Sequence, residues 1–168
     1  VLCDVRNLKM HFPVTEGVFV QRVVAWVKAI DGLSFQIMKG ETLGLVGESG
    51  CGKTTTGRCI LQLEDPTTGE IMFRGQDING LDKKQMIDVR KKIQVIFQDP
   101  FSSLNPRMKI GDIITEPMRV HDIIPGEEAR RQRAVELLTT CGLKANFYDR
   151  YPHEMSGGMR QRVMIAIA

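Results

Sequence analysis

Residues 47–55 read GESGCGKTT, a stretch in which three glycines are followed by a lysine and two threonines. The stretch contains the pattern GxxxxGK[ST] between an apolar segment at 41–46, a predicted strand, and a segment at 54–63, a predicted helix. Glycines let a backbone curl closely around an anion, and a helix N-terminus adds unpaired N–H groups and a positive dipole end. This context predicts a loop that binds the phosphates of a nucleotide.

Within this loop, Lys53 is expected to reach the β- and γ-phosphates, and the Thr54 hydroxyl is expected to bind Mg²⁺. Cys51 occupies a variable position of the pattern and has no evident histidine partner, so we interpret it as an ordinary thiol. The alternative is a chance match in a glycine-rich turn. The predicted nucleotide-contacting residues of the loop are Gly47, Glu48, Ser49, Gly50, Cys51, Gly52, Lys53, Thr54 and Thr55.

The bulk composition narrows the class of protein. A length of 168 residues is typical of one domain, and a hydrophobic content of 42% is enough for a core. The net charge of +3 is too small to indicate a nucleic-acid partner. Four cysteines without metal-ligand spacing favour a reducing compartment. No apolar run approaches the roughly 18 residues of a membrane span, so we expect any membrane role to depend on a partner.

The remaining elements follow from periodicity and turn residues. Predicted strands are 1–12, 27–37, 70–75 and 93–97, and predicted helices are 82–93, 110–120, 127–141 and a last one beginning at 159. The residues Pro13, Thr15 and Gly17 predict a loop after the first strand, and Gly142 is a predicted helix cap.

Two further motifs accompany the glycine-rich loop. The segment VIFQDP places Gln98 at the end of an apolar strand candidate, and MSGGMRQR occupies 155–162 at the start of a helix. Together with the loop, they resemble the ATP-binding subunit of ABC transporters over the whole chain. The resemblance implies an α/β P-loop NTPase (ABC ATPase) fold with an antiparallel β portion and a helical subdomain. We expect a single partial domain divided into 1–102, 103–155 and 156–168.

In this family the SGG segment of one subunit closes on the γ-phosphate of ATP held by a second ATP-binding subunit. The resemblance assigns that role to Ser156, Gly157, Gly158 and Met159, where Met159 replaces the more usual Gln. A helix N-terminus built from small residues suits an anion. A simple helix cap is the alternative interpretation.

The resemblance also assigns Gln98 to Mg²⁺ and the attacking water, with Lys53 as the other catalytic residue. Phe12 is the candidate for stacking on adenine, with a core position as its alternative and Trp26 as a rival. Segments 99–107, 116–118 and 12–32 are similar to subunits that serve oligopeptide, dipeptide and nickel importers.

These similarities imply a subunit at the cytoplasmic face of the membrane that couples MgATP hydrolysis to solute import, with peptides as the favoured solute. Its partners would be membrane permeases, a second ATP-binding subunit and, indirectly, an extracytoplasmic solute receptor. A non-transport ABC-type ATPase, active in DNA repair or translation, and another P-loop enzyme such as a small-molecule kinase are the alternatives.

By the same resemblance, an Asp for Mg²⁺, a catalytic Glu and a switch His would follow Ala168. The three histidines, His11, His121 and His153, do not stand at the switch position. Two further strands of the family sheet would separate 41–46 from 93–97. We therefore expect the 168 residues by themselves to be poorly stable and to have little ATPase activity.

Overall fold

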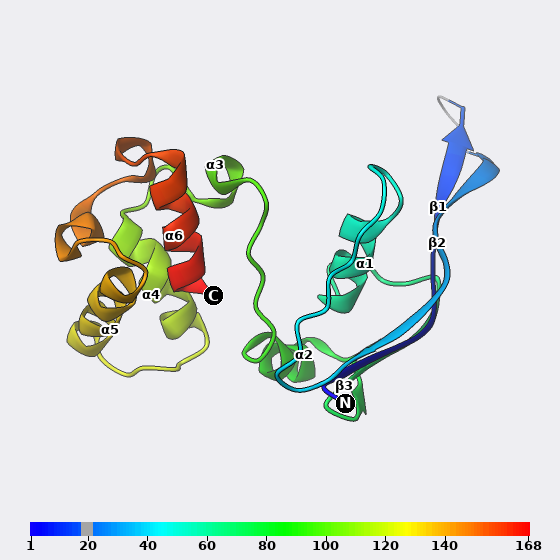
Figure 1. Cartoon of the computed structure of the whole chain (residues 1–168), viewed down its shortest axis with the longest axis horizontal. Coiled ribbons are helices and arrows are strands. Elements are labelled where there is room, and N and C mark those ends of the chain that lie inside the picture. The colour runs from blue at the N-terminus through cyan, green and yellow to red at the C-terminus, as the bar shows by residue number, and fades with distance from the viewer. Residues whose placement is uncertain (18–21) are drawn as a thin grey trace. The chain divides into compact units, whose positions relative to one another are not determined.

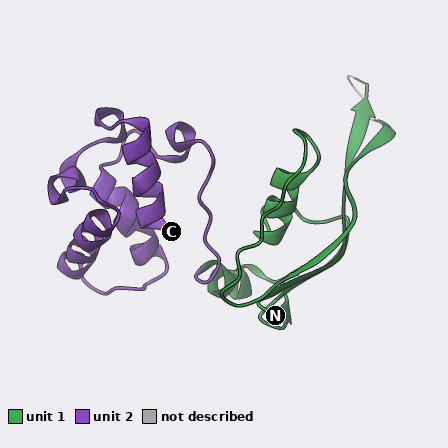
Figure 2. Cartoon of the chain, viewed as in Figure 1, with its two compact units in different colours: residues 1–90 green, residues 91–168 purple. Residues whose placement is uncertain are grey.

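The computed structural model describes residues 1–17 and 22–168 and divides the chain into two compact units. The first unit comprises Val1–Arg90 and the second comprises Lys91–Ala168 (Figure 2). The expected boundaries at residues 102 and 155 remain predictions. The segment 12–32, which carries part of the family resemblance, includes residues 18–21, and these lie outside the described residues.

An antiparallel sheet organises the first unit (Figure 1). Its strands are β1 (Cys3–Glu16), β2 (Arg22–Ile37), β3 (Thr68–Phe73) and β4 (Gln76–Asp77), in the spatial order β2-β1-β3-β4. Cys3 pairs with Ile37 on one side and with Phe73 on the other, which fixes the register of three strands. The predicted strands at 1–12, 27–37 and 70–75 are confirmed, although their ends differ.

The predicted loop at Pro13 and Thr15 is wrong, because β1 continues to Glu16. Pro13 pairs with Trp26 of β2, whereas the pairing of β1 with β3 extends only to Lys9. Beyond Lys9, no strand of the described residues pairs with β1 on that side, so Pro13 lies on an edge. Proline is tolerated in a strand at such an edge, because its missing N–H removes no ladder hydrogen bond there.

The core of the first unit lies between this sheet and helix α1 (Lys53–Ile60). Val5 and Leu8 of β1, Ile71 of β3 and Cys59 of α1 are almost completely buried. Full burial of one such aliphatic side chain contributes about 1.5–3 kcal/mol. Helix α2 (Lys83–Arg90) forms within the predicted segment 82–93. This packing holds the N-terminus of α1, and with it the glycine-rich loop, beside β2.

The predicted strands at 41–46 and 93–97 are wrong for this structure, since neither segment belongs to the sheet of the described residues. Their apolar side chains are exposed: Val46 is 90% exposed and Phe97 is 52% exposed. A strand needs neighbours that complete its hydrogen-bond ladder. Within 1–17 and 22–168, β1 to β4 pair only with one another, so an apolar, β-branched composition does not produce a strand at either segment.

The second unit consists of short helices around one apolar core. Its helices are α3 (Pro100–Ser103), α4 (Ile110–Val120), α5 (Glu127–Thr140) and α6 (Gly157–Ile167), with 3-10 turns η1 (Ala145–Asp149) and η2 (Pro152–Glu154). Ile110, Ile114, Leu138 and Val163 are the largest fully buried side chains of this core. The predicted helices at 110–120 and 127–141 are confirmed. No helix in the described ranges is long and apolar enough to cross a membrane.

Two predicted helix ends are also observed in the second unit. Gly142 follows α5 with a φ of +75°, and its N–H donates to the Thr139 carbonyl. The left-handed conformation suits glycine, which explains why α5 ends there. At the start of α6, the Ser156 hydroxyl accepts a hydrogen bond from the Met159 N–H at 3.4 Å.

Candidate nucleotide-binding site

Two glycines of the loop adopt conformations that other residues resist. Gly50 has a φ of +85°, and Gly52, the N-cap of α1, has a φ of +93°. Gly52 also lies so close to the Ala29 carbonyl of β2 that a Cβ would collide with it, whereas a Cβ on Gly50 would meet open space. The loop is therefore shaped by left-handed backbone and by a close approach to β2, and both requirements select glycine.

The Lys53 ammonium group lies inside the curl of the loop. It donates to the carbonyls of Gly47 at 2.8 Å and Glu48 at 2.6 Å, and it lies 3.5 Å from the Cys51 sulfur. Lys53 is also the first residue of α1, so its charge adds to the positive end of the helix dipole. This arrangement concentrates positive charge and backbone N–H groups at one place, which suits an anion.

The threonines after Lys53 differ in their surroundings. Thr54 is exposed in the first turn of α1, and Thr55 is half-buried. Thr56 is buried, and its hydroxyl donates to the Gly52 carbonyl at 3.0 Å. Sequence reasoning missed this anchoring role of Thr56, because three consecutive threonines give no sign of which one turns inward.

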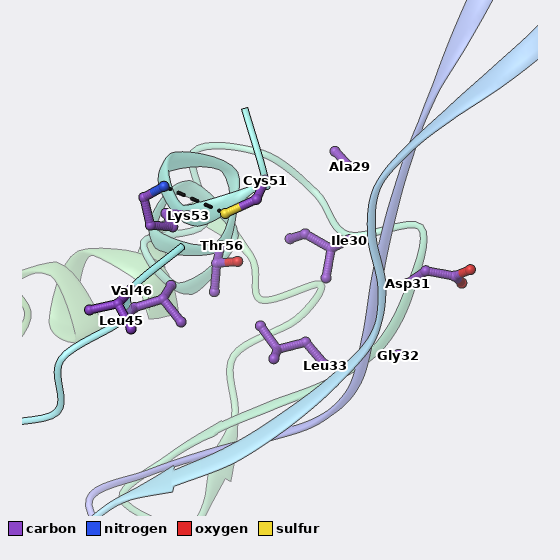
Figure 3. Close-up of a pocket in the computed structure, with 10 residues that line it drawn as sticks. All are labelled: Ala29, Ile30, Asp31, Gly32, Leu33, Leu45, Val46, Cys51, Lys53 and Thr56. Carbon is purple, nitrogen blue, oxygen red and sulfur yellow. Dashed lines mark hydrogen bonds between the residues drawn. The ribbon is translucent and has the colours of Figure 1, made fainter. Parts of the chain in front are cut away.

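A cavity of about 340 Å³ lies beside the loop (Figure 3). Lys53, Cys51 and Thr56 line it from the side of α1, and Leu45 and Val46 line it from the segment before the loop. The remaining lining residues come from β2: Ala29, Ile30, Asp31, Gly32 and Leu33. Sequence reasoning did not place β2 at this site, because only the pairing of strands reveals that 29–33 lie next to the loop.

The described residues contain no group of three or more His, Cys, Asp or Glu side chains that could hold a metal ion. Mg²⁺ prefers oxygen ligands and takes most of them from water and substrate phosphates. One exposed hydroxyl, that of Thr54, at a positively polarised anion site fits this mode of binding. Cys59 of α1 is less reactive than an ordinary thiol, because burial, and then the negative charges of Glu64 and Asp65, raise its pKa.

The other predicted site residues lie elsewhere. Gln98 is exposed, directly before Asp99, in the second unit. Ser156 begins α6 in that same unit, with Gly157 and Met159 half-buried and Gly158 exposed. Phe12 is half-buried on β1, opposite Val27, and is not among the residues that line the cavity.

The structure therefore gathers Gly47–Thr55 in the first unit, and it places Gln98 and Ser156–Met159 in the second. The functional roles of these residues remain predictions. Trp26, the rival of Phe12, is 57% exposed on β2.

Comparison with known proteins decides the family. Residues 30–168 match the ABC transporter family. The chain belongs to this family. Membership confirms the resemblance that the three motifs predict, and with it the fold class of a P-loop ABC ATPase domain.

Curated relatives of this ABC protein are transport ATP-binding proteins. The oligopeptide transport protein AppF of Bacillus subtilis (strain 168) is 51% identical over 168 residues, which are 99% of this chain and 50% of AppF. The dipeptide transport protein DppF of Escherichia coli (strain K12) is 47% identical over 95% of this chain and 47% of DppF. The chain thus spans about half the length of the curated relatives it matches.

Solved ABC structures have the same fold. The ATP-binding cassette MJ0796, in a dimeric post-hydrolysis state bound to ADP and Pi, matches with a TM-score of 0.81 and 26% identity. The match covers 98% of this chain and 68% of the MJ0796 chain. A second dimeric structure of MJ0796 gives a TM-score of 0.79 at 27% identity.

Proposed function

We propose that the full-length protein is the ATP-binding subunit of an ABC importer, and that it couples MgATP binding and hydrolysis to the uptake of peptides through membrane permeases. The observation that carries the proposal is the Lys53 ammonium group held inside the curl of 47–52, at the N-terminus of α1. The names of the relatives, which are oligopeptide, dipeptide and glutathione transport proteins, support the solute class.

Phosphate binding follows from the loop. The carbonyls of Gly47 and Glu48 now accept the hydrogen bonds of Lys53, and both are exposed to solvent. Phosphate oxygens carry more negative charge than carbonyl oxygens and form stronger, charge-assisted hydrogen bonds. In the proposed complex Lys53 exchanges these carbonyls for the β- and γ-phosphates. The N–H groups of 47–55 hold the remaining oxygens.

Hydrolysis requires groups around the γ-phosphate. Mg²⁺ supplies charge neutralisation between the phosphates when it is bound, and the Thr54 hydroxyl is its proposed ligand in this loop. Gln98 is proposed to help hold Mg²⁺ and to orient the attacking water. Phe12 is the proposed stacking partner of adenine. Lys53 stabilises the charge that develops on the transferred phosphoryl group.

The second anion-binding element suggests an assembly. Ser156, Gly157 and Gly158 begin α6, and we propose that they complete the ATP site of a second ATP-binding subunit. ATP then stabilises the closed pair, because it contacts both subunits only when they meet. The dimeric state named for MJ0796 supports this arrangement. We place the assembly on the cytoplasmic face of the membrane, where it receives solute indirectly from an extracytoplasmic receptor.

The proposal is tested with the full-length protein purified from its native membranes. We expect it to co-purify with permease subunits and to hydrolyse MgATP, and we expect Lys53→Ala to abolish turnover. Lys84 of α2 is exposed and lies outside the site, so Lys84→Ala is the matched control and should keep normal turnover.

Three other results would contradict the proposal. ATPase activity that depends on nucleic acid would indicate a non-transport ABC-type ATPase. Turnover that survives Ser156→Ala unchanged would indicate a different P-loop enzyme. Purification without any permease subunit would contradict the transport role itself.

A further inference from the structure

A cation–π pair joins the segment after Gln98 to the helix that begins at Ser156. The guanidinium carbon of Arg160, on the first turn of α6, lies 4.0 Å from the centre of the Phe101 ring on α3. In Figure 1, α3 lies beside the N-terminal part of α6. A cation within about 6 Å of an aromatic ring centre is attracted to the ring face.

The Phe101 ring also lies beside Gly157, the first glycine of α6. A Cβ on Gly157 would lie 3.7 Å from the edge of the Phe101 ring, so the ring covers one side of that glycine. The Arg160 side chain also donates from Nε to the Pro152 carbonyl at 2.8 Å. The backbone N–H of Arg160 donates to the Ser156 carbonyl at 3.0 Å. Arg160 thus links η2, the first turn of α6 and the ring on α3.

The other end of the link is anchored next to Gln98. The Asp99 carboxylate accepts the Phe101 N–H at 2.8 Å and so caps α3. The Ser103 hydroxyl donates back to the Asp99 carbonyl. These hydrogen bonds hold the backbone of Phe101 in α3, although the residue is 64% exposed. Burial does not hold the ring in place, whereas the Asp99 cap and Arg160 do.

We propose, on the basis of the proposed function, that Phe101 and Arg160 are positioning residues for the ATP site of the partner subunit. They set the direction of the first turn of α6, and therefore the direction in which the N–H groups of Ser156–Gly158 point. The pair thereby joins the first turn of α6 to α3.

The test is a double-mutant cycle in the full-length protein, assembled with its membrane subunits. Phe101→Leu removes the ring face, Arg160→Gln removes the cation, and the double variant removes both. We expect each single variant to lower the kcat of MgATP hydrolysis about 2- to 5-fold, the factor that an exposed cation–π pair is worth. The kcat of the double variant should be no lower than that of the more impaired single variant, because both substitutions remove the same interaction.

Two controls separate positioning from folding and from other contacts. Phe101→Tyr keeps the ring face and should retain normal kcat. Arg150, whose guanidinium carbon lies 5.0 Å from the centre of the Phe147 ring, forms a similar pair away from α6, and Arg150→Gln should leave kcat unchanged. The affinity of the isolated full-length subunit for MgATP should be normal in every variant, because 47–55 are untouched.

If the free-energy effects of the two single substitutions on kcat added up in the double variant, the inference would be overturned. Such additivity would indicate that Phe101 contacts another subunit independently of Arg160. A normal kcat in Phe101→Leu would overturn it as well. Failure of the proposed function would look different, because the unsubstituted protein would then bind no MgATP or show no turnover in its assembly.

Discussion

Gly52 offers the sharpest test of the loop geometry, with Gly50 as its matched control. Both glycines have left-handed backbone, at φ +93° and φ +85°, so alanine is strained at either position by about 1–2 kcal/mol. Only Gly52 lies against the Ala29 carbonyl of β2, which belongs to a paired strand and cannot move freely. Gly50→Ala therefore measures the strain alone, and Gly52→Ala measures strain together with displacement of the loop.

A strain of about 1–2 kcal/mol lowers affinity roughly 5- to 30-fold if it falls entirely on the bound loop. We expect Gly50→Ala to weaken MgATP binding within that range. Overpacking of a close contact adds about 1–3 kcal/mol, which gives about 2–5 kcal/mol in all, so Gly52→Ala should weaken binding roughly 30-fold or more.

Isothermal titration calorimetry of the two full-length variants with MgATP measures both affinities, and thermal unfolding without nucleotide reports any loss of stability. The reasoning would be refuted if Gly52→Ala bound MgATP as tightly as Gly50→Ala while both variants remained folded.

Three further predictions concern the second unit. Ser156→Ala should lower the free energy of unfolding by about 1 kcal/mol or less in urea denaturation, since it removes the hydroxyl that caps α6 through a 3.4 Å hydrogen bond; an unchanged midpoint would show that the cap does not stabilise the helix. Gly111→Ala should cost about 1–3 kcal/mol in the same assay, because its Cβ would overlap the Tyr148 ring, and wild-type stability would contradict the packing described for α4. The third prediction concerns Asp99, where hydrogen bonds from the Phe101 N–H and then from Ser102 lower the pKa of the carboxyl group. A lowered pKa stabilises the cap above the ordinary carboxyl pKa of about 3.9, and this stabilisation is lost as pH falls through the folded value. The NMR shift of the Phe101 amide should therefore titrate in acid in the wild type and stay constant in Asp99→Asn; an amide that titrates equally in both would refute the cap.

The parts of the fold that the sequence predicted well are those set by neighbouring residues. The helices at 110–120 and 127–141 form because their apolar residues recur at helical spacing and because Gly142 can end α5 in a left-handed conformation. The glycine-rich loop is placed before α1 for similar local reasons. Membership of the ABC transporter family followed from three short motifs.

The wrong predictions concern strands, whose formation depends on distant partners. The segments 41–46 and 93–97 have a strand composition, yet the sheet of the described residues does not include them. At Pro13 the error is the opposite one, because a loop was predicted where a strand forms. There β2 supplies a pairing partner that local turn signals could not reveal. For the same reason, the contribution of 29–33 to the cavity could not be predicted from periodicity.

The site residues outside the loop remain predictions for a different physical reason. Roles for Gln98, Ser156 and Phe12 require a nucleotide and a second subunit to define which atoms they contact. By their local surroundings, Gln98 is an exposed amide, Ser156 is a helix start and Phe12 is a half-buried ring. Such features occur in many proteins without a ligand.

The central claim is that residues 47–54 bind a triphosphate through backbone N–H groups and the Lys53 ammonium group. Calorimetric titration of the full-length protein with MgATP tests it most directly, beside the variants Lys53→Ala and Lys84→Ala. We expect saturable binding by the wild type and by Lys84→Ala, and a large loss of affinity in Lys53→Ala. Equal affinity in all three proteins, or no detectable binding by the wild type, would contradict it.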